Sequence, residues 1–175
     1  MFLLVQGSEN GMGAGNQQER LDTNWVVGFV DGEGCFHVAI NKLPKMSLGW
    51  QVLPEFRVVQ HQRDEGTLHQ IREFFGLGVV TRNHGDRMEF RARGMENLNK
   101  IIEFFKKHPF KTSAKQRSFE QFCQVIKMMD NKEHLTREGL DKIASIAAEM
   151  NRKPRLKYLE SSETIRQTSH EGSGL

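Results

Sequence analysis

The chain has 175 residues, and its 25 lysines and arginines slightly outnumber its 22 acidic residues, which gives a formal net charge of +3. This length suits a single domain of about 100–200 residues and excludes two large independent domains. No run approaches the ~18–20 uninterrupted apolar residues of a membrane-spanning helix. The apolar residues 1–5 are too few for a signal-peptide core, and two cysteines are too few for a disulfide framework.

Both ends of the sequence are predicted to be tails. Residues 1–22 hold a tract of glycine and polar side chains that cannot bury a core, and residues 151–175 contain few apolar side chains. We therefore expect one folded domain over residues 23–150, with a flexible tail on each side.

The first predicted elements are a short helix and a strand. Thr23 or Asn24 could cap a helix over residues 25–33, and Gly34 could end it. Residues 35–41 then carry apolar side chains at every second position, which is typical of a half-buried strand.

The later elements continue this mixture of strands and helices. A loop at 43–49 leads to a second strand at 51–62, and a helix of about ten residues follows, which Gly76 ends. The remaining elements are strands at 78–82 and 88–93 joined by a turn at 83–86, a helix around 98–105, a helix at 113–129 and a last helix capped by Thr136. Hairpin-linked strands interleaved with helices indicate an α+β domain, in which helices cover one face of an antiparallel sheet.

The other face of that sheet is expected to be polar and basic. Arg57 alternates with Phe56 and Val58, and Arg91 and Arg93 alternate with apolar neighbours. One interpretation is an ordinary solvated face, which antiparallel sheets often have. The other is contact with nucleic acid, because arginine, asparagine and glutamine pair with base edges and a β-ribbon fits the major groove. A second basic cluster, which would hold phosphates or simply form a helix surface, comprises Lys100, Lys106, Lys107, Lys111, Lys115 and Arg117.

The most informative stretch is the predicted helix at residues 25–33. Gly28 and Gly32 lie on one helix face, where each glycine costs roughly 0.5–1 kcal/mol relative to alanine. The pair is either incidental or marks a close approach of another backbone. Asp31 and Glu33 lie at the carboxyl end, where the helix dipole disfavours acids. Simple exposure would explain these acids, and so would a bound divalent cation that takes carboxylate and carbonyl oxygens as ligands.

Residues 26–34, Val-Val-Gly-Phe-Val-Asp-Gly-Glu-Gly, resemble the signature nonapeptide of the LAGLIDADG homing endonucleases. The likeness extends to residues 55–60, 75–78 and 109–111 and covers about residues 24–129. The sequence departs from the common pattern in its two valines and in a Glu where many members have Asp, although Glu is also an oxygen ligand. The resemblance implies an αββαββα core, with a saddle-shaped antiparallel sheet lying along the DNA major groove, followed by C-terminal helices.

The resemblance also implies roles for individual residues. The implied catalytic residues are Glu33, Gln60, Lys115, Lys111 and Arg63. Glu33 would hold Mg²⁺ or Mn²⁺ together with the carbonyl oxygen of Gly32, while Ca²⁺ would support binding without cleavage. Gln60 would position the attacking water, and either Lys115 or Lys111 would lie nearest the scissile phosphate. The implied DNA-contacting residues are His37, Ala39, Asn41, Arg57, Arg82, Asn83, Glu89, Arg91 and Arg93.

A single copy of the motif implies a homodimer that binds double-stranded DNA at a near-palindromic target. The implied dimer interface comprises Val27, Gly28, Asp31 and Gly32. Each strand would be cut once to leave a 3′ overhang. The resemblance implies location in a chloroplast or mitochondrion, with the gene lying within an organellar intron, and a prokaryotic cytoplasm is the alternative location.

Other functions fit the sequence less well. An RNA-splicing maturase or a non-cleaving DNA-binding regulator would use the same fold, but an intact Glu33 favours a nuclease. A plain interaction domain would leave the helix-end acids and paired glycines unexplained. A zinc site is disfavoured because His61, His69 and His84 lack partners at ligand spacing. Nucleotide hydrolysis is disfavoured because no phosphate-cradling glycine loop precedes a Lys-Ser/Thr pair.

Overall fold

The computed structural model describes residues 20–150 and Tyr158. The elements in chain order are α1 (Thr23–Glu33), β1 (Gly34–Lys42), β2 (Trp50–His61), the 3-10 turn η1 (Gln62–Asp64), α2 (Glu65–Phe75), β3 (Val79–His84), β4 (Arg87–Ala92), α3 (Met95–Lys107), α4 (Ser113–Asp130), the 3-10 turn η2 (Glu133–Leu135) and α5 (Arg137–Met150). This order confirms the predicted αββαββα core with further helices behind it. Within the described residues no helix is long and apolar enough to cross a membrane.

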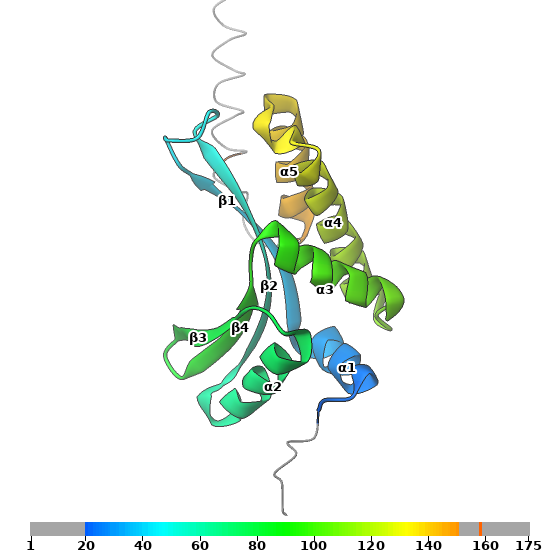
Figure 1. The fold of residues 1–175 in the computed structure, drawn as a ribbon. Coiled ribbons are helices and arrows are strands. Elements are labelled where there is room, and N and C mark those ends of the chain that lie inside the picture. The colour runs from blue at the N-terminus through cyan, green and yellow to red at the C-terminus, as the bar shows by residue number, and fades with distance from the viewer. Residues whose placement is uncertain (1–19, 151–157, 159–175) are drawn as a thin grey trace, which may run out of the picture.

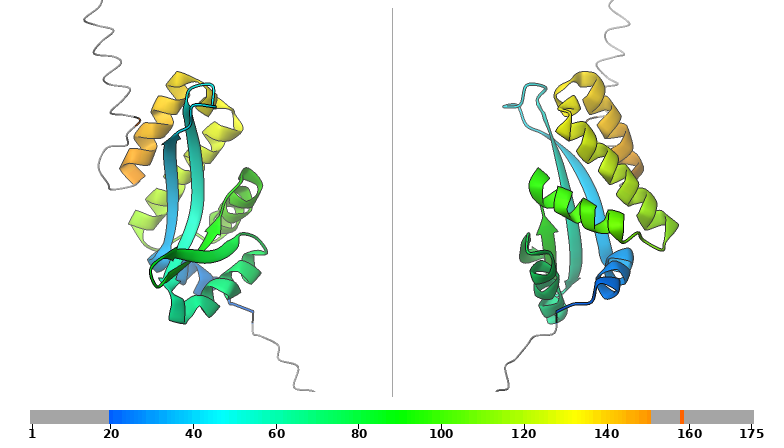
Figure 2. Two further views of the ribbon diagram at one scale, coloured as in Figure 1. Left: turned by 90° about the vertical axis from the view of Figure 1, so that its left-hand side faces the viewer. Right: turned by 45° about the vertical axis from the view of Figure 1, so that its right-hand side comes forward.

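The four strands form one antiparallel sheet in the order β1-β2-β4-β3. The sheet is twisted and curved, and α3, α4 and α5 lie on one side of it (Figure 1). The left panel of Figure 2 looks onto the opposite side, with these helices behind the strands. The sheet therefore has one covered face and one open face, as the alternation of side chains predicted.

The covered face holds a core rich in phenylalanine. Phe36 of β1 is 5% exposed, and its ring centroid lies 5.1 Å from that of Phe56 on β2 and 5.3 Å from that of Phe122 on α4. Phe105 of α3 and Phe110 stack at 4.6 Å beside them. Because these rings come from two strands, two helices and a loop, the core joins the sheet and the helices into one unit.

The first helix begins differently from the prediction. Asp22 caps α1, because its Oδ1 accepts hydrogen bonds from the backbone N–H groups of Asn24 at 2.8 Å and Trp25 at 3.1 Å. The predicted caps, Thr23 and Asn24, are therefore wrong. An aspartate one residue earlier satisfies the same free N–H groups.

The turn between the two shorter strands is tighter than predicted. β3 continues to His84 and β4 begins at Arg87, so only Gly85 and Asp86 lie between them, where a turn over residues 83–86 was expected. Gly85 has a positive φ of 59°, which glycine adopts without strain. The pairing also shifts register between Arg82 and His84.

A glycine joins the motif helix directly to the sheet. A Cβ on Gly34 would lie 2.5 Å from Val30 Cγ1 and 2.8 Å from the Val30 carbonyl oxygen, so no side chain fits there. The chain thus passes from α1 into β1 without a loop. This junction holds Glu33, the last residue of α1, at the end of the sheet.

The packed part of the chain reaches beyond residue 150. Tyr158 is 1% exposed, its ring centroid lies 5.2 Å from that of Trp50, and its hydroxyl donates a hydrogen bond to Asp141. The rest of the expected C-terminal tail, and the expected N-terminal tail up to residue 19, lie outside the described residues.

Candidate active site and nucleic-acid interface

Glu33 and Gln60 meet at one end of the sheet. Gly34 pairs with Val58 across β1 and β2, so the end of α1 lies beside the end of β2. An open hollow of about 570 Å³ forms there, and it is lined by Glu33, Val59, Gln60, His61, Asp86 and Arg87. The structure therefore brings together the two residues for which the sequence predicted metal binding and water positioning.

Three polar residues of this hollow were not predicted as site residues. His61 and Arg87 face each other in the β2–β4 register, and Asp86 comes from the adjoining turn. The Nε2 atom of His61 lies 2.9 Å from Asp86 Oδ2, and its Nδ1 accepts the N–H of Arg63 at 3.1 Å. This pattern assigns the hydrogen to Nε2. From the sequence, His61 was considered only as a zinc ligand, a role that was disfavoured, and only strand register places this residue at the same hollow as Glu33.

Lys115 lies close to the same end of α1. Its ammonium group donates a hydrogen bond to the carbonyl oxygen of Gly34. Burial lowers the pKa of Lys115, while electrostatic interactions with Cys35, Asp31 and Glu33 oppose that shift. The amine is thus within electrostatic reach of Glu33.

The other two basic candidates lie differently. Lys111 is exposed and contributes its backbone N–H to Asp31 at 2.9 Å. Arg63 has a side chain that is 76% exposed, with Nε 3.3 Å from Asp64 Oδ2, and it does not line the hollow. Of the two lysines between which the sequence could not decide, the geometry favours Lys115.

Asp31 is fully engaged within its own chain. Its Oδ2 accepts the backbone N–H groups of Lys111 at 2.9 Å and Thr112 at 3.0 Å, and its Oδ1 accepts the Thr112 hydroxyl. Burial would raise the pKa of Asp31, but the hydrogen bonds from Thr112 and Lys111 and the charge of Lys115 outweigh it and lower that pKa. This acid therefore ties α1 to the start of α4.

The donors available for a metal ion are oxygen atoms. Glu33 offers an exposed carboxylate, and Gly32 offers a backbone carbonyl near the helix end, both of which suit a hard cation such as Mg²⁺. Within the described residues no group of three or more His, Cys, Asp or Glu side chains comes together. One copy of the chain thus offers oxygen donors of a kind that suits a divalent cation.

The open face carries most of the residues predicted to contact DNA. Arg57 on β2 lies opposite Cys35 on β1 and Arg91 on β4, and His37 lies opposite Glu55. Their neighbours in each strand point into the core. The face prediction is confirmed for His37, Ala39, Asn41, Arg57, Glu89 and Arg91, and Arg93 follows directly after β4.

Arg82 and Asn83 cannot share that face, because successive strand residues point to opposite sides. The register pairs Arg82 with Met88, on the side of Phe90 and the core, whereas Thr81 pairs with Glu89 on the open side. The expectation that Arg82 is an outward strand residue of the open face is therefore wrong. It lies at the strand end, where it is exposed and its Nη1 lies 3.4 Å from the carbonyl oxygen of Gly85.

The open face also contains two buried acids. Glu55 and Glu89 are 4% and 3% exposed and lie between arginine side chains. Glu55 contacts Arg57 and Arg93, and Glu89 contacts Arg91. Glu55 was not predicted as a site residue. One of its partners, Arg57, lies two positions along the same strand, and the other, Arg93, lies 38 positions away in the chain.

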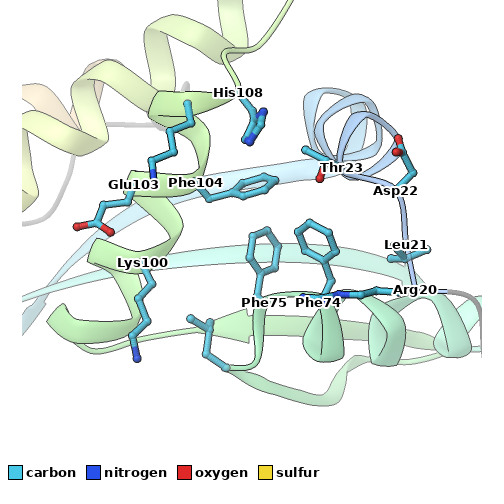
Figure 3. A pocket seen from close by; sticks show the side chains of 12 residues that line it. Arg20, Leu21, Asp22, Thr23, Phe74, Phe75, Lys100, Glu103, Phe104 and His108 are labelled. Carbon is cyan, nitrogen blue, oxygen red and sulfur yellow. The ribbon is translucent and has the colours of Figure 1, made fainter.

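A larger pocket lies elsewhere, between the start of α1, the end of α2 and α3 (Figure 3). It has a volume of about 760 Å³, and Phe74, Phe75 and Phe104 form its aromatic part. Lys100, Glu103 and other charged side chains surround these rings. None of the implied catalytic residues lines this pocket, so its size does not make it the candidate active site.

One face of α1 is open in the single chain. A Cβ added to Gly28 or Gly32 would meet nothing within 4 Å. Trp25 is 42% exposed and stacks on Phe29 with ring centroids 4.7 Å apart. Nothing in the described chain therefore requires glycine at these two positions, although each weakens the helix.

Comparison with known proteins identifies the family. The model of the LAGLIDADG endonuclease family matches residues 26–126, which contain both Glu33 and Gln60. The chain belongs to the LAGLIDADG endonuclease family. The match covers the motif helix, the sheet and most of α4, so the family fold accounts for the whole arrangement around the hollow.

Curated LAGLIDADG relatives include fungal and algal proteins. The chain is 34% identical over 131 residues to "Probable intron-encoded endonuclease 3" of Neurospora crassa, covering 73% of this chain and 24% of that protein. It is 28% identical over 116 residues to "DNA endonuclease I-CvuI" of Chlorella vulgaris, covering 66% of this chain and 70% of that protein. The chain thus spans about a quarter of the length of the Neurospora relative.

Solved structures have the same fold. The homing endonuclease I-TnaI is 51% identical with a TM-score of 0.76, and the match covers 82% of this chain and 97% of that one. The meganuclease I-CpaMI, solved bound to uncleaved DNA, is 29% identical with a TM-score of 0.77, and the match covers 84% of this chain and 50% of that one. The predicted fold class is confirmed.

Proposed function

We propose that this chain is a site-specific endonuclease that cuts double-stranded DNA at a long target, one phosphodiester bond in each strand, leaving 3′ overhangs. The observation that carries the proposal is the meeting of Glu33 and Gln60 in one hollow at the end of an arginine-bearing sheet face. The presence of Lys115 beside the same helix end supports it. An open sheet face could hold the DNA, while this end would face the bond to be cut.

Four residues at this end of the sheet have a definite task in this proposal. Glu33 and the carbonyl oxygen of Gly32 would hold Mg²⁺ or Mn²⁺, which supplies Lewis-acid activation of water and of the phosphate when bound. Gln60 would orient the attacking water with its side-chain amide, which can both donate and accept hydrogen bonds. Lys115 would stabilise negative charge that develops on the phosphate.

The proposed active form contains two copies of the chain, packed through α1. One copy offers a single available carboxylate at the end of α1, because the Asp31 carboxylate is occupied within the chain. The open space beside Gly28 and Gly32 would allow two α1 helices to pack closely. The interface would also include Val27, and the two-fold symmetry would favour a near-palindromic target.

The names of relatives support an intron-encoded origin. Matching proteins include intron-encoded endonucleases of Neurospora crassa and a protein encoded in ND4 intron 1 of Podospora anserina. We propose that this chain is likewise encoded in an organellar intron. Its target would then be the uninterrupted sequence into which such an intron inserts.

The decisive experiment compares the wild type with Glu33→Gln. A randomised double-stranded DNA library is incubated with the wild type in Mg²⁺ to select a cleaved sequence, and both proteins are then tested on that duplex. We expect cleavage by Glu33→Gln to fall at least ~10³-fold, while binding in Ca²⁺ stays within about threefold. The solved structure of I-SmaMI with uncleaved target and calcium ions supports the choice of Ca²⁺ for the binding arm. Binding without any cleavage by the wild type would favour the non-cleaving regulator instead.

The two-copy arrangement is tested separately with Gly28→Leu. A leucine there has room in the single chain, so the variant should remain folded. It should weaken self-association in sedimentation experiments by at least ~10-fold and reduce cleavage in parallel, because the helices can no longer approach. A Gly66→Leu variant, also at an open helix glycine, serves as the matched control. Unchanged association of Gly28→Leu would contradict this interface.

A further inference from the structure

The open face of the sheet carries two buried acidic residues, although a surface that binds DNA would be expected to carry basic side chains. Glu55 and Glu89 alternate in their strands with Phe56 and Phe90, which point into the core. Both carboxylates are nevertheless almost inaccessible, at 4% and 3% exposure. A buried carboxylate is stable only when it is paired and hydrogen-bonded, so the neighbouring cations must hold these two in place.

Glu55 holds two guanidinium groups. Both Nε and Nη2 of Arg93 lie 2.6 Å from its Oε2, and Nε of Arg57 lies 3.3 Å from its Oε1. Glu89 holds one guanidinium group, with Nη1 of Arg91 3.0 Å from its Oε1. Among the described residues, Oε2 of Glu89 has no hydrogen-bond partner.

The pairing register explains why acids are needed here. Arg57 and Arg91 stand directly opposite each other on β2 and β4, and like charges in such positions repel. Glu55 and Glu89 flank this pair on its two sides, so a carboxylate lies next to each of the two opposed arginines. A surface built only to attract phosphates would gain nothing from two carboxylates, because each one weakens the attraction.

The acids do something that plain positive charge cannot, which is to orient the arginines. A guanidinium group has five N–H donors in a rigid fork, and Glu55 occupies the Nε and Nη2 donors of Arg93. The remaining donors are left for another partner, and the side chains of Arg57, Arg91 and Arg93 stay 28%, 28% and 43% exposed. An arginine fork matches the O6 and N7 acceptors of guanine in the major groove.

We infer that Glu55 and Glu89 are positioning residues, which preset Arg57, Arg91 and Arg93 to read guanine without touching the DNA themselves. This inference rests on the proposed function. Pre-ordering the forks reduces the side-chain entropy lost on binding, so it increases affinity for the matching bases only. Each half of the preferred target should therefore contain guanines whose replacement weakens binding strongly.

The test measures base preference. Wild type, Glu55→Gln and Glu89→Gln are used to select duplexes from a randomised DNA library in Ca²⁺, and affinities for the selected duplex and its single-base variants are then measured at several salt concentrations. Glu96→Gln is the matched control, because Glu96 is an exposed acid of α3 paired with Lys100 at 2.8 Å. Thermal unfolding of each variant checks that it is folded.

We expect the wild type to lose about tenfold or more in affinity when a critical guanine becomes adenine. For Glu55→Gln the same replacement should lower affinity by less than about threefold. The dependence of its affinity on salt should equal that of the wild type, because phosphate contacts are unchanged. Glu96→Gln should match the wild type. In Arg93→Ala, adding Glu55→Gln should cause little further loss at the bases that Arg93 reads, because the two residues act as one unit.

Two results would overturn the inference while leaving the proposed function intact. One is a selected target without guanine discrimination. The other is a Glu55→Gln variant that binds every duplex more tightly with unchanged base preference, as simple removal of negative charge predicts. If Glu55→Gln fails to fold, Glu89→Gln decides the question, because one of its carboxylate oxygens has no partner to lose. A wild type that enriches no sequence would refute the proposed function itself, and this inference with it.

Discussion

The two acids in the last turn of α1, Asp31 and Glu33, have different surroundings. Asp31 and Glu33 are separated by one residue and lie at the same unfavourable end of the helix dipole. The Asp31 carboxylate receives three hydrogen bonds from Lys111 and Thr112. Glu33 is exposed at the hollow and makes no hydrogen bond or ion pair with the described residues. One acid thus organises the fold, while the other is exposed at the hollow.

The position of Asp31 also explains how an acid is tolerated at the end of α1. Thr112 immediately precedes α4, so its N–H and that of Lys111 belong to the amino-terminal end of that helix. Such N–H groups and the positive end of a helix dipole attract anions. Two helix ends of opposite polarity therefore meet at this carboxylate, and the contact fixes the position of Lys115 in the first turn of α4 relative to Glu33.

The largest effect expected on the Glu33 side, apart from Glu33 itself, is that of Lys115. Lys115→Met should lower the rate of DNA cleavage by about 10²–10³-fold, because a preorganised positive charge near the reacting phosphate is lost. DNA binding in Ca²⁺ should change much less. Lys111→Met is the matched control and should lower the cleavage rate less than tenfold. A larger loss for Lys111 than for Lys115 would reverse the assignment made from the geometry.

On the Asp31 side we expect a loss of stability rather than of chemistry. Asp31→Asn should lower the free energy of unfolding by about 1–2 kcal/mol, a modest value because the contact is accessible to solvent. Urea denaturation at neutral pH measures it. Glu33→Gln, the matched variant on the other side, should stay within ~0.5 kcal/mol of the wild type. Equal losses in both variants would remove the distinction between the two acids.

Acid should erase the stability difference between the wild type and Asp31→Asn. The pKa of Asp31 is lowered from its ordinary value of 3.8 by the hydrogen bonds that outweigh burial, so the ionised form is favoured in the fold. Its contribution is fully present above pH 3.8 and is lost as pH falls through the lower, folded-state pKa. Denaturation curves of the two proteins should therefore converge below that pH. A gap that does not narrow as pH falls below 3.8 would show that ionisation of Asp31 is not its cause.

The smallest effect expected concerns Cys35, on the open face two residues after Glu33. Cys35 is exposed, whereas burial raises the pKa of the Cys123 thiol to about 11. A maleimide at neutral pH should therefore modify Cys35 first, because the thiolate is the reactive form. Bound target DNA should slow the reaction at Cys35 by roughly fivefold and leave Cys123 unaffected. Equal rates at Cys35 with and without DNA would place the DNA elsewhere.

Much of the fold could be predicted because it rests on local patterns. Alternation in residues 35–41 identified β1, and the apolar spacing before Gly76 identified α2 and its end. Errors occurred where short polar residues compete for the same task, as with Asp22 at the start of α1. The prediction that Arg82 lies on the open face was wrong for a different reason. The orientation of this residue depends on which residue of β4 it pairs with.

The candidate site was predictable in its residues but not in its arrangement. The resemblance to the family implied Glu33, Gly32 and Gln60. No local pattern indicated that His61 and Asp86 lie in the same hollow. The buried state of Glu55 was equally invisible, because acids on an outward strand position are normally exposed.

By itself the sequence determined the order of helices and strands, the division of the sheet into an apolar and a polar face, and the family motif. These properties follow from hydrogen bonding and side-chain periodicity over a few residues. Only the tertiary structure decided that Asp31 binds Lys111 and Thr112, 80 and 81 positions away, while Glu33 lines the same hollow as Gln60. The reason is physical: the partner of a carboxylate depends on strand register and helix packing, which join residues that are far apart in the chain.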